Sequence, residues 1–222
     1  MLSYHTEDCW INWIDTLSAQ GYVIIDPFLK DDLYQTLNHY FFTKLEHDAL
    51  KKAGIGAMHH HHLNNSIRTD RIYWVDKQKD LMIDPFFSLL DECIFMLRRH
   101  CFLPIHGYEF HFAHYPPGSF YKKHIDQFKG RGNRLISMII YMNDQWVTED
   151  GGALRLFNPE SEELVWPHAN TNFVDIAPLK QRAVLFRSEL LEHEVLTTQK
   201  SRYSITGWLL HMPHKIGWLE NS

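Results

Sequence analysis

Residues 124–126 read His124-Ile125-Asp126, and the interpretation of the fold starts from this tripeptide. Side chains at positions i and i+2 of an extended strand point to the same face. The imidazole of His124 and the carboxylate of Asp126 would then lie side by side, with Ile125 directed into the core. The chain holds 16 histidines and 15 aspartates, so chance alone supplies about one tripeptide of this kind. Its surroundings must decide whether it is a metal site.

The C-terminal half of the chain has the pattern of an all-strand structure. Short apolar segments with a period of two are separated by turn signals such as Pro116-Pro117-Gly118 and Gly151-Gly152. The predicted strands cover residues 108–115, 135–142, 153–157, 172–176, 183–186, 193–196 and 203–210.

The N-terminal half is predicted to be mainly helical. Apolar residues between Trp10 and Leu17 recur at i, i+3, i+4 and i+7, as on one face of a helix. A second helical pattern opens at Asp31, and Asp84-Pro85 provides the N-cap and first-turn proline of a third helix. Short strands are predicted at residues 22–25 and 67–75.

Residues 48–66 lose this periodicity and include the run His59-His60-His61-His62. Four histidines could bind a metal, but consecutive residues on a loop cannot all reach one ion without special geometry. We therefore expect a solvated surface loop.

Helices followed by many short strands predict an α+β fold, a jelly roll buttressed by N-terminal helices. No internal repeat or linker divides the sequence, so one domain over residues 1–222 is predicted. Its helical buttress would span about 1–104 and its jelly-roll core about 105–212.

Composition limits the classes of partner. The 222 residues are 45% hydrophobic and carry a net charge of -5, so the chain is globular and has no overall positive charge to hold nucleic acid. Its cysteines, Cys9, Cys93 and Cys101, form no disulfide framework. No signal peptide or apolar run of membrane-spanning length is evident, and a soluble cytoplasmic protein without a membrane partner is predicted.

A third ligand for the proposed metal would have to come from a distant strand. His193 opens an apolar strand, and Arg202 opens the next one. Two histidines and one carboxylate form the open metal site of non-haem iron proteins, and a buried arginine suits a carboxylate partner. On spacing alone, a core histidine and a structural salt bridge are equally good interpretations of His193 and Arg202.

The order His124, Asp126, His193 and Arg202 resembles the Fe(II)- and 2-oxoglutarate-dependent dioxygenases. The similarity is greatest to their prolyl 4-hydroxylase branch, which includes the hypoxia-factor prolyl hydroxylases and their bacterial relatives. The stretches that carry it lie at residues 67–74, 113–118, 121–126, 139–143, 151–157 and 202–208. The resemblance implies a double-stranded β-helix, in agreement with the jelly roll expected from the strand pattern.

The resemblance also implies a role for each residue that matches the family pattern. His124, Asp126 and His193 would hold Fe(II). Arg202 and Tyr141 would bind the distal carboxylate of 2-oxoglutarate, Thr206 would add a hydrogen bond, and Tyr115 would line that pocket. Residues implied near the substrate are Arg134 and Trp208, beside the target proline, and Arg68 and Asp70, at the base of a covering loop.

The implied reaction consumes O2 and 2-oxoglutarate, releases succinate and CO2, and hydroxylates a proline in a protein or peptide, with ascorbate as a supporting reductant. Two alternatives remain open: hydroxylation of a free amino acid or small molecule, and a non-catalytic module that binds 2-oxoglutarate. The remaining histidines, among them His111 and His114, are interpreted as surface or core residues, and Tyr121 as part of the solvated approach to the site.

Overall fold

The computed structural model describes residues 3–54, 66–127, 133–159, 161–168 and 170–211. Three α-helices, α1 (Glu7–Gln20), α2 (Asp31–Glu46) and α3 (Asp84–Cys101), are accompanied by two short 3-10 helices at Leu81–Ile83 and Thr148–Asp150. The strands are β1 (Tyr22–Ile25), β2 (Lys51–Lys52), β3 (Arg71–Trp74), β4 (Gly107–Tyr115), β5 (Tyr121–His124), β6 (Arg134–Tyr141), β7 (Leu154–Phe157), β8 (Phe173–Ile176), β9 (Ala183–Arg187), β10 (His193–Val195) and β11 (Arg202–Leu210).

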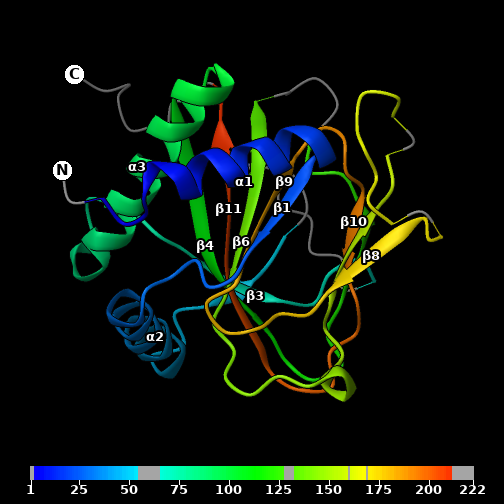
Figure 1. The fold of residues 1–222 in the computed structure, drawn as a ribbon. Coiled ribbons are helices and arrows are strands. Elements are labelled where there is room, and N and C mark those ends of the chain that lie inside the picture. Colours follow the sequence, from blue (N-terminus) through cyan, green and yellow to red (C-terminus); the bar gives the residue numbers. More distant parts are fainter. Residues whose placement is uncertain (1–2, 55–65, 128–132, 160, 169, 212–222) are drawn as a thin grey trace, which may run out of the picture.

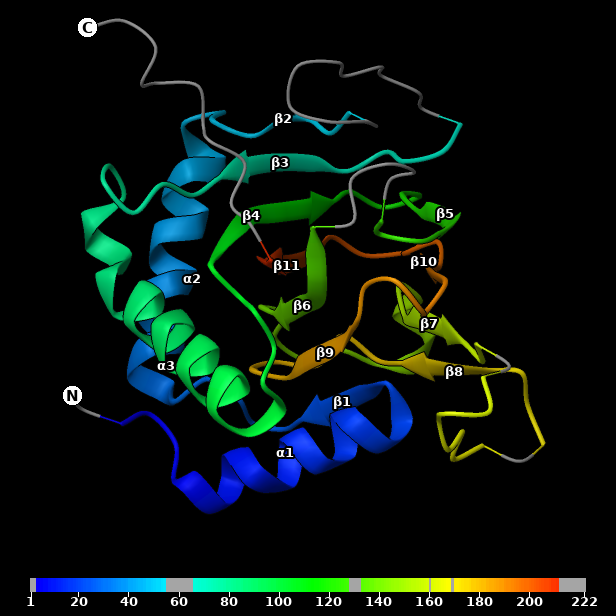
Figure 2. The same cartoon turned by 90° about the horizontal axis from the view of Figure 1, so that it is seen from above.

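The strands form two antiparallel sheets. The major sheet has the order β1-β9-β6-β11-β4-β3-β2, and the minor sheet has the order β5-β10-β7-β8. Figure 2 shows the minor sheet beside one face of the major sheet, with the helices at its other face. Tyr141 and Phe186 of the major sheet share a buried cluster with Leu154 and Leu156 of the minor sheet, so apolar side chains hold the two sheets together. The predicted helix-buttressed jelly roll is confirmed.

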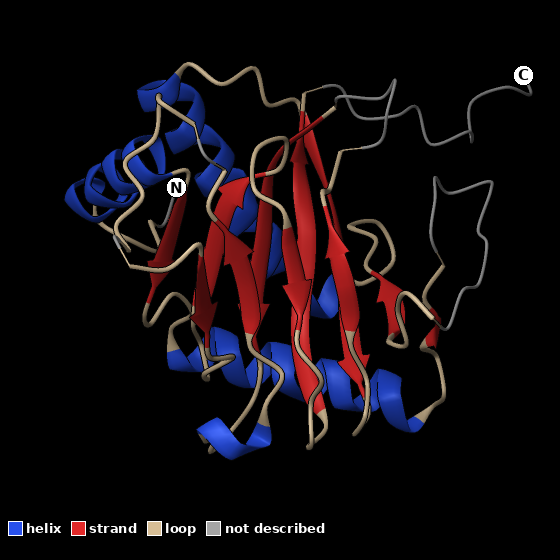
Figure 3. Ribbon diagram, turned by 90° about the vertical axis from the view of Figure 1, so that its right-hand side faces the viewer, coloured by secondary structure: helices blue, strands red, loops and turns tan. Residues whose placement is uncertain are grey.

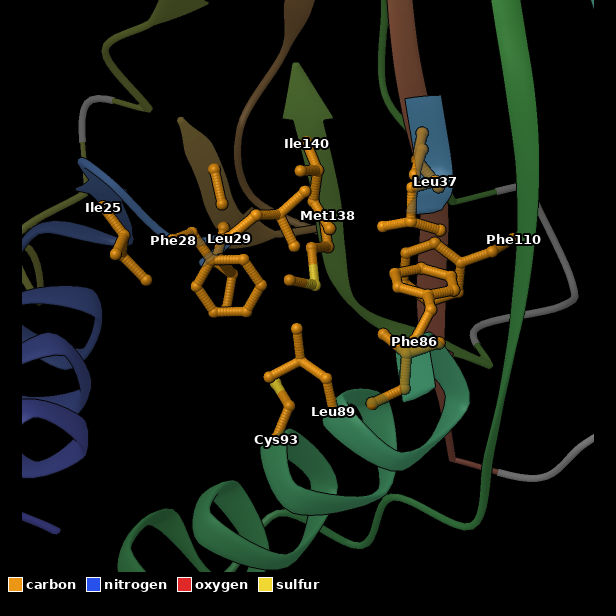
Figure 4. Close-up of a cluster of buried hydrophobic side chains, with 14 of the residues drawn as sticks. Ile25, Phe28, Leu29, Leu37, Phe86, Leu89, Cys93, Phe110, Met138 and Ile140 are labelled. Atoms are coloured by element: carbon orange, nitrogen blue, oxygen red, sulfur yellow. The ribbon is translucent and has the colours of Figure 1, made fainter. Parts of the chain in front are cut away.

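The helices pack on the outer face of the major sheet (Figures 1 and 3). Side chains alternate along a strand, and Phe110 of β4 and Met138 of β6 therefore point to the helices, where they meet Phe86 and Leu89 of α3 (Figure 4). The intervening residues of the same strands point to the inner face. That inner face, between the sheets, is where the candidate site lies.

The predicted elements differ from the structure mainly at their ends. The segment predicted as a strand over residues 67–75 is regular only as β3, and Arg68 makes an isolated bridge to Tyr121. The predicted loop 48–66 contains the two-residue strand β2. The run from His59 to His62 lies outside the described residues. Within the described residues, no helix is long and apolar enough to cross a membrane.

Candidate metal and co-substrate site

Three potential metal ligands meet at the inner ends of β5 and β10. His124 closes β5 and is in register with His193, which opens β10. The carboxylate of Asp126 lies between them, with Oδ1 3.6 Å from His124 Nε2 and Oδ2 3.5 Å from His193 Nε2. One ligand atom from each residue lies within 4.8 Å of the other two. The structure thus brings together the three residues that the sequence singled out.

Asp126 reaches this position in a different way from the one predicted. The strand ends at His124, so the expectation that residues 124–126 form one strand with Ile125 in the core is wrong. Ile125 is 40% exposed, whereas Asp126 is buried. After the strand ends, the chain bends and turns the carboxylate inward, where it accepts a hydrogen bond from Ser137.

The hydrogen bonds of the two histidines leave their inner nitrogens available. Nδ1 of His124 donates to the carbonyl of Lys122 at 2.7 Å, and Nδ1 of His193 donates to that of Leu191 at 3.2 Å. A carbonyl only accepts, so Nδ1 of each ring carries the proton and the Nε2 lone pair remains free. This tautomer, fixed by a backbone carbonyl, is usual for metal-ligating histidines.

The pKa values of His193 and Asp126 are shifted in the directions that favour binding of a metal cation. Burial, together with His124, lowers the pKa of His193 to about 4. Burial would raise the pKa of Asp126, but His193, His124 and Arg134 outweigh it and hold that pKa below its usual range. At neutral pH, His193 is therefore neutral and Asp126 ionised, which are the forms that bind metal.

Two serines that the sequence did not indicate support the carboxylate. Ser137 Oγ donates to Asp126 Oδ2 at 2.6 Å and lies 2.9 Å from Ser188 Oγ. Both serines are buried. Ser137 lies on β6 and Ser188 directly follows β9, and no local motif marks either residue.

Arg202, at the start of β11, points to the inner face and is almost completely buried, at 1% exposure. Its Nε donates to the carbonyl of Gly152 at 2.9 Å, and its Nη1 lies 3.5 Å from Ser204 Oγ. Among the described residues, no carboxylate forms an ion pair with it, and its Nη2 has no hydrogen-bond partner. The alternative interpretation of Arg202 as a structural salt bridge therefore lacks an acid.

The surroundings of Arg202 suit one carboxylate. The hydroxyl of Tyr141 is also buried without a partner among the described residues, and the guanidinium lies 5.0 Å from the ring centroids of both Tyr141 and Tyr115. Burial raises the pKa of Tyr141, although Arg202 opposes the shift, so the phenol stays protonated and can donate. Thr206 Oγ1 lies 3.2 Å from Ser204 Oγ in the same row. Two buried donors without acceptors, one of them cationic, fit an anionic acid group.

Comparison with known proteins agrees with this geometry. The sequence profile of the 2OG-Fe(II) oxygenase superfamily matches residues 110–210, the interval that holds all three ligands and Arg202. Residues 110–210 of this chain are thus similar to the 2OG-Fe(II) oxygenase superfamily. That superfamily uses Fe(II), 2-oxoglutarate and O2, and the match confirms the resemblance seen in the sequence.

The proteins that this chain resembles include several prolyl hydroxylases. It is 30% identical over 214 residues to a hypoxia-inducible factor prolyl hydroxylase of Caenorhabditis elegans, covering 89% of this chain but only 27% of that protein. A crystal structure of a Pseudomonas putida prolyl-4-hydroxylase has 29% identity and a TM-score of 0.78, covering 90% of this chain and 98% of that chain. A Trichoplax adhaerens prolyl hydroxylase, solved with a hypoxia inducible factor oxygen degradation domain peptide fragment, has 26% identity and a TM-score of 0.79, covering 92% of this chain and 90% of that chain.

The residues predicted near the substrate lie beside the candidate metal ligands. Arg134 lies 3.4 Å above the ring of Trp208, donates to Glu109 at 2.8 Å, and donates to the backbone carbonyl of Asp126 at 3.2 Å. The contact with Asp126 connects the stacked pair directly to a ligand residue.

A second group lies on the other side of His124. Arg68 forms two hydrogen bonds to Asp70, of 2.8 and 2.6 Å, and lies 4.5 Å from the ring centroid of Tyr121. Tyr121 in turn stacks on His124 with a centroid separation of 3.7 Å. The interpretation of Tyr121 as part of a solvated approach is therefore wrong: its ring packs directly on His124, a candidate metal ligand.

Proposed function

We propose that this chain is an Fe(II)- and 2-oxoglutarate-dependent prolyl 4-hydroxylase that acts on a proline in a protein or peptide, consuming O2 and releasing succinate and CO2. The observation that carries the proposal is the buried Arg202, whose Nη2, like the nearby hydroxyl of Tyr141, has no hydrogen-bond partner in the part of the chain that the structure describes. Both groups lie on the inner face that the three metal ligands also face. A site for a cation next to a site for a carboxylate suits a metal-bound oxo acid.

The three ligands and their supports would hold the metal in one orientation. His124, Asp126 and His193 bind it, while the Ser137 hydroxyl fixes the carboxylate between the two rings. When bound, the iron supplies the oxidative chemistry that couples decarboxylation of 2-oxoglutarate to hydroxylation of the substrate. The protein contributes geometry, charge and the exclusion of water.

Arg202 and Tyr141 orient the co-substrate by its distal carboxylate. Each side chain is at most 1% exposed, so their hydrogen bonds to an anion form away from competing water and are correspondingly strong. Tyr115 lines the pocket, and Thr206 extends the polar row toward the metal. Ascorbate would act as the reductant that keeps the iron ferrous.

A peptidyl proline is the substrate that the comparisons favour. The similarity to the Pseudomonas putida and Trichoplax adhaerens prolyl hydroxylases supports it. In this proposal Arg134 and Trp208 lie beside the target proline, and Arg68 and Asp70 contact the peptide further out. The proposal specifies a prolyl residue in a polypeptide and does not extend to the hypoxia-inducible factor.

Turnover with defined peptides tests the proposal. The protein, supplied with Fe(II), ascorbate, O2 and 2-oxoglutarate, is incubated with synthetic proline-containing peptides, and succinate is measured together with a +16 mass shift on proline. His124→Ala and Asp126→Ala should abolish both signals, whereas His106→Ala, outside the site, should not.

Each other outcome has a defined meaning. Full turnover in His124→Ala or Asp126→Ala would remove the ligand assignment. Succinate release without oxidation of proline, in peptides or in a cellular proteome, would overturn the choice of substrate in favour of a small-molecule oxygenase. Binding of 2-oxoglutarate without any succinate would indicate a non-catalytic module.

A further inference from the structure

Two more buried polar atoms on the inner face have no hydrogen-bond partner within the described part of the chain. His111 of β4 is 2% exposed and Trp208 of β11 is 7% exposed. Neither the Nδ1 of His111 nor the Nε1 of Trp208 has a hydrogen-bond partner among the described residues. Their ring centroids are 5.7 Å apart. The carboxylate of 2-oxoglutarate accounts for Arg202 and Tyr141, but not for this second pair.

Strand register places this pair on the metal side of the sheet. His111 alternates with Phe110 and Phe112, which face the helices, so it points to the inner face. It is in register with Thr206 on β11 and with Trp74 on β3.

Contacts connect Trp208 to the metal ligands. Arg134 stacks on its ring at 3.4 Å and also donates to the backbone carbonyl of Asp126. A single side chain, that of Arg134, therefore connects Trp208 to the candidate metal ligand Asp126.

The pair is separate from the co-substrate pocket. Tyr141 lies on β6, and β11 runs between β6 and β4, so two strand spacings, about 10 Å, separate it laterally from His111. The ring of His111 contacts Trp74 and Trp208, with centroid separations of 4.8 and 5.7 Å, and the two indoles lie 6.3 Å from each other. The three rings form one aromatic cluster, and within the described residues no ring contact joins this cluster to Tyr141.

The chemistry of the two rings specifies what could satisfy them. An indole N–H only donates, and a neutral imidazole has one donor nitrogen. Burial, reinforced by Arg68 and Arg134, holds the pKa of His111 well below its usual range, so the ring is neutral. A prolyl residue has no amide N–H and offers only carbonyls, its own and that of the preceding residue. With the proton of the neutral His111 ring on Nδ1, the two buried N–H groups are complementary to the backbone around a proline.

We propose that His111 is a specificity-determining residue that, together with Trp208, donates hydrogen bonds to the two carbonyl oxygens flanking the target proline. This inference rests on the proposed prolyl hydroxylase function. Trp74 packs against the imidazole, and Arg134, held by Glu109, packs against the indole, so both donors are fixed before the peptide arrives. Any other residue in place of proline has an amide N–H, and this donor would face the N–H groups of His111 and Trp208, to which it cannot hydrogen-bond.

The test separates hydrogen bonding from packing. His111→Met removes the donor and keeps an apolar side chain, whereas His111→Gln keeps an N–H donor. The probe is the synthetic proline peptide most rapidly oxidised by the wild-type protein, with two analogues that carry a thioamide, a weaker acceptor, at one or the other flanking carbonyl. We expect His111→Met to raise the KM for the parent peptide about tenfold with the KM for 2-oxoglutarate at its wild-type value, and His111→Gln to restore most of the loss.

The thioamide peptides identify the contact directly. One analogue should raise the wild-type KM about tenfold yet cause no further loss in His111→Met, because the two changes remove the same hydrogen bond. The matched control is His114→Met on the same strand. His114 faces outward and stacks on Tyr203 at 4.8 Å, so its replacement should leave the peptide KM unchanged.

The failures of the two proposals are distinguishable. An unchanged peptide KM in His111→Met, a rise in the KM for 2-oxoglutarate instead, or fully additive losses with both thioamides would each overturn the role of His111 while prolyl hydroxylation stands. Absence of proline oxidation by the wild-type protein would overturn the proposed function and this inference with it. An equal loss in His111→Gln and His111→Met would show that His111 contributes packing only.

Discussion

Replacement of Tyr141 by Phe should have opposite effects on stability and on co-substrate binding. The Tyr141 side chain is completely buried, and its hydroxyl has no partner among the described residues. A buried polar group without a partner costs about 1–3 kcal/mol. Tyr141→Phe removes this group and retains the ring that packs in the inter-sheet cluster. The free energy of unfolding of the metal-free protein should therefore rise, by about 1 kcal/mol.

The same hydroxyl should contribute strongly once 2-oxoglutarate is bound. Its acceptor would be an ionised carboxylate shared with Arg202, and hydrogen bonds to charged groups contribute about 1.5–3 kcal/mol. Loss of that bond corresponds to an increase of about 10- to 100-fold in the dissociation constant of 2-oxoglutarate. A hydroxyl that served only the core would give neither of these results.

Two measurements check this pair of effects. Urea denaturation in the presence of a chelator gives the stability of the metal-free protein, and anaerobic titration of the Fe(II)-loaded protein with 2-oxoglutarate gives the affinity. Tyr203→Phe, on the helix side of the same sheet, is the matched control and should leave 2-oxoglutarate binding unchanged. Lower stability of Tyr141→Phe together with an unchanged dissociation constant would refute the assignment of Tyr141 to the co-substrate.

Three further predictions concern the metal site and the sheet. Ser137→Ala removes the hydrogen bond to Asp126 and should weaken Fe(II) binding about tenfold, measured by competition with a chelator, whereas Ser204→Ala, a buried serine beside the co-substrate site, should not. The pKa of His193 is lowered from 6.5 to about 4 in the folded chain. As the pH falls, the imidazole of His193 is therefore protonated in the unfolded chain before it is protonated in the folded chain. The free energy of unfolding of the metal-free protein should then fall by about 3 kcal/mol as the pH drops from 6.5 to 4, and His193→Gln should flatten that slope in urea titrations. Gly207→Ala would press a methyl group into the backbone of β4 and should lower the free energy of unfolding by about 3 kcal/mol, seen as a shifted urea midpoint.

The sequence could predict those elements whose signals are local. The period-two pattern predicted a strand over residues 203–210, and β11 covers Arg202–Leu210. The spacing between Trp10 and Leu17 predicted the first helix, and α1 buries Trp10, Ile14 and Leu17. His193 was predicted to open a strand, and it opens β10. Each of these features depends on residues within one turn or one strand.

The rest of the site depends on pairing between distant strands. Ser137 and Ser188 meet only because β6 and β9 are neighbours in the major sheet. His111 lies beside Trp208 through the pairing of β4 with β11. These contacts have no signature in local spacing. The inward turn of Asp126 after the end of β5 was missed for the same reason. The hydroxyl that donates a hydrogen bond to its carboxylate belongs to Ser137 on β6, a different strand.

The register of β11 links the fold to every part of the site. Arg202, Thr206 and Trp208 all occupy alternate positions that face inward, while Ile205 and Leu209 face the helices. A shift of one residue in the pairing of β11 would turn Arg202, proposed to bind the co-substrate, and Trp208, proposed to contact the substrate, into the helix-side core together. Gly207 opposes such a shift, since a side chain there would collide with β4. Co-substrate binding and substrate recognition therefore depend on the same strand pairing, and a mutation that loosens this pairing should impair both at once, unlike changes at Tyr141 or His111, which should separate them.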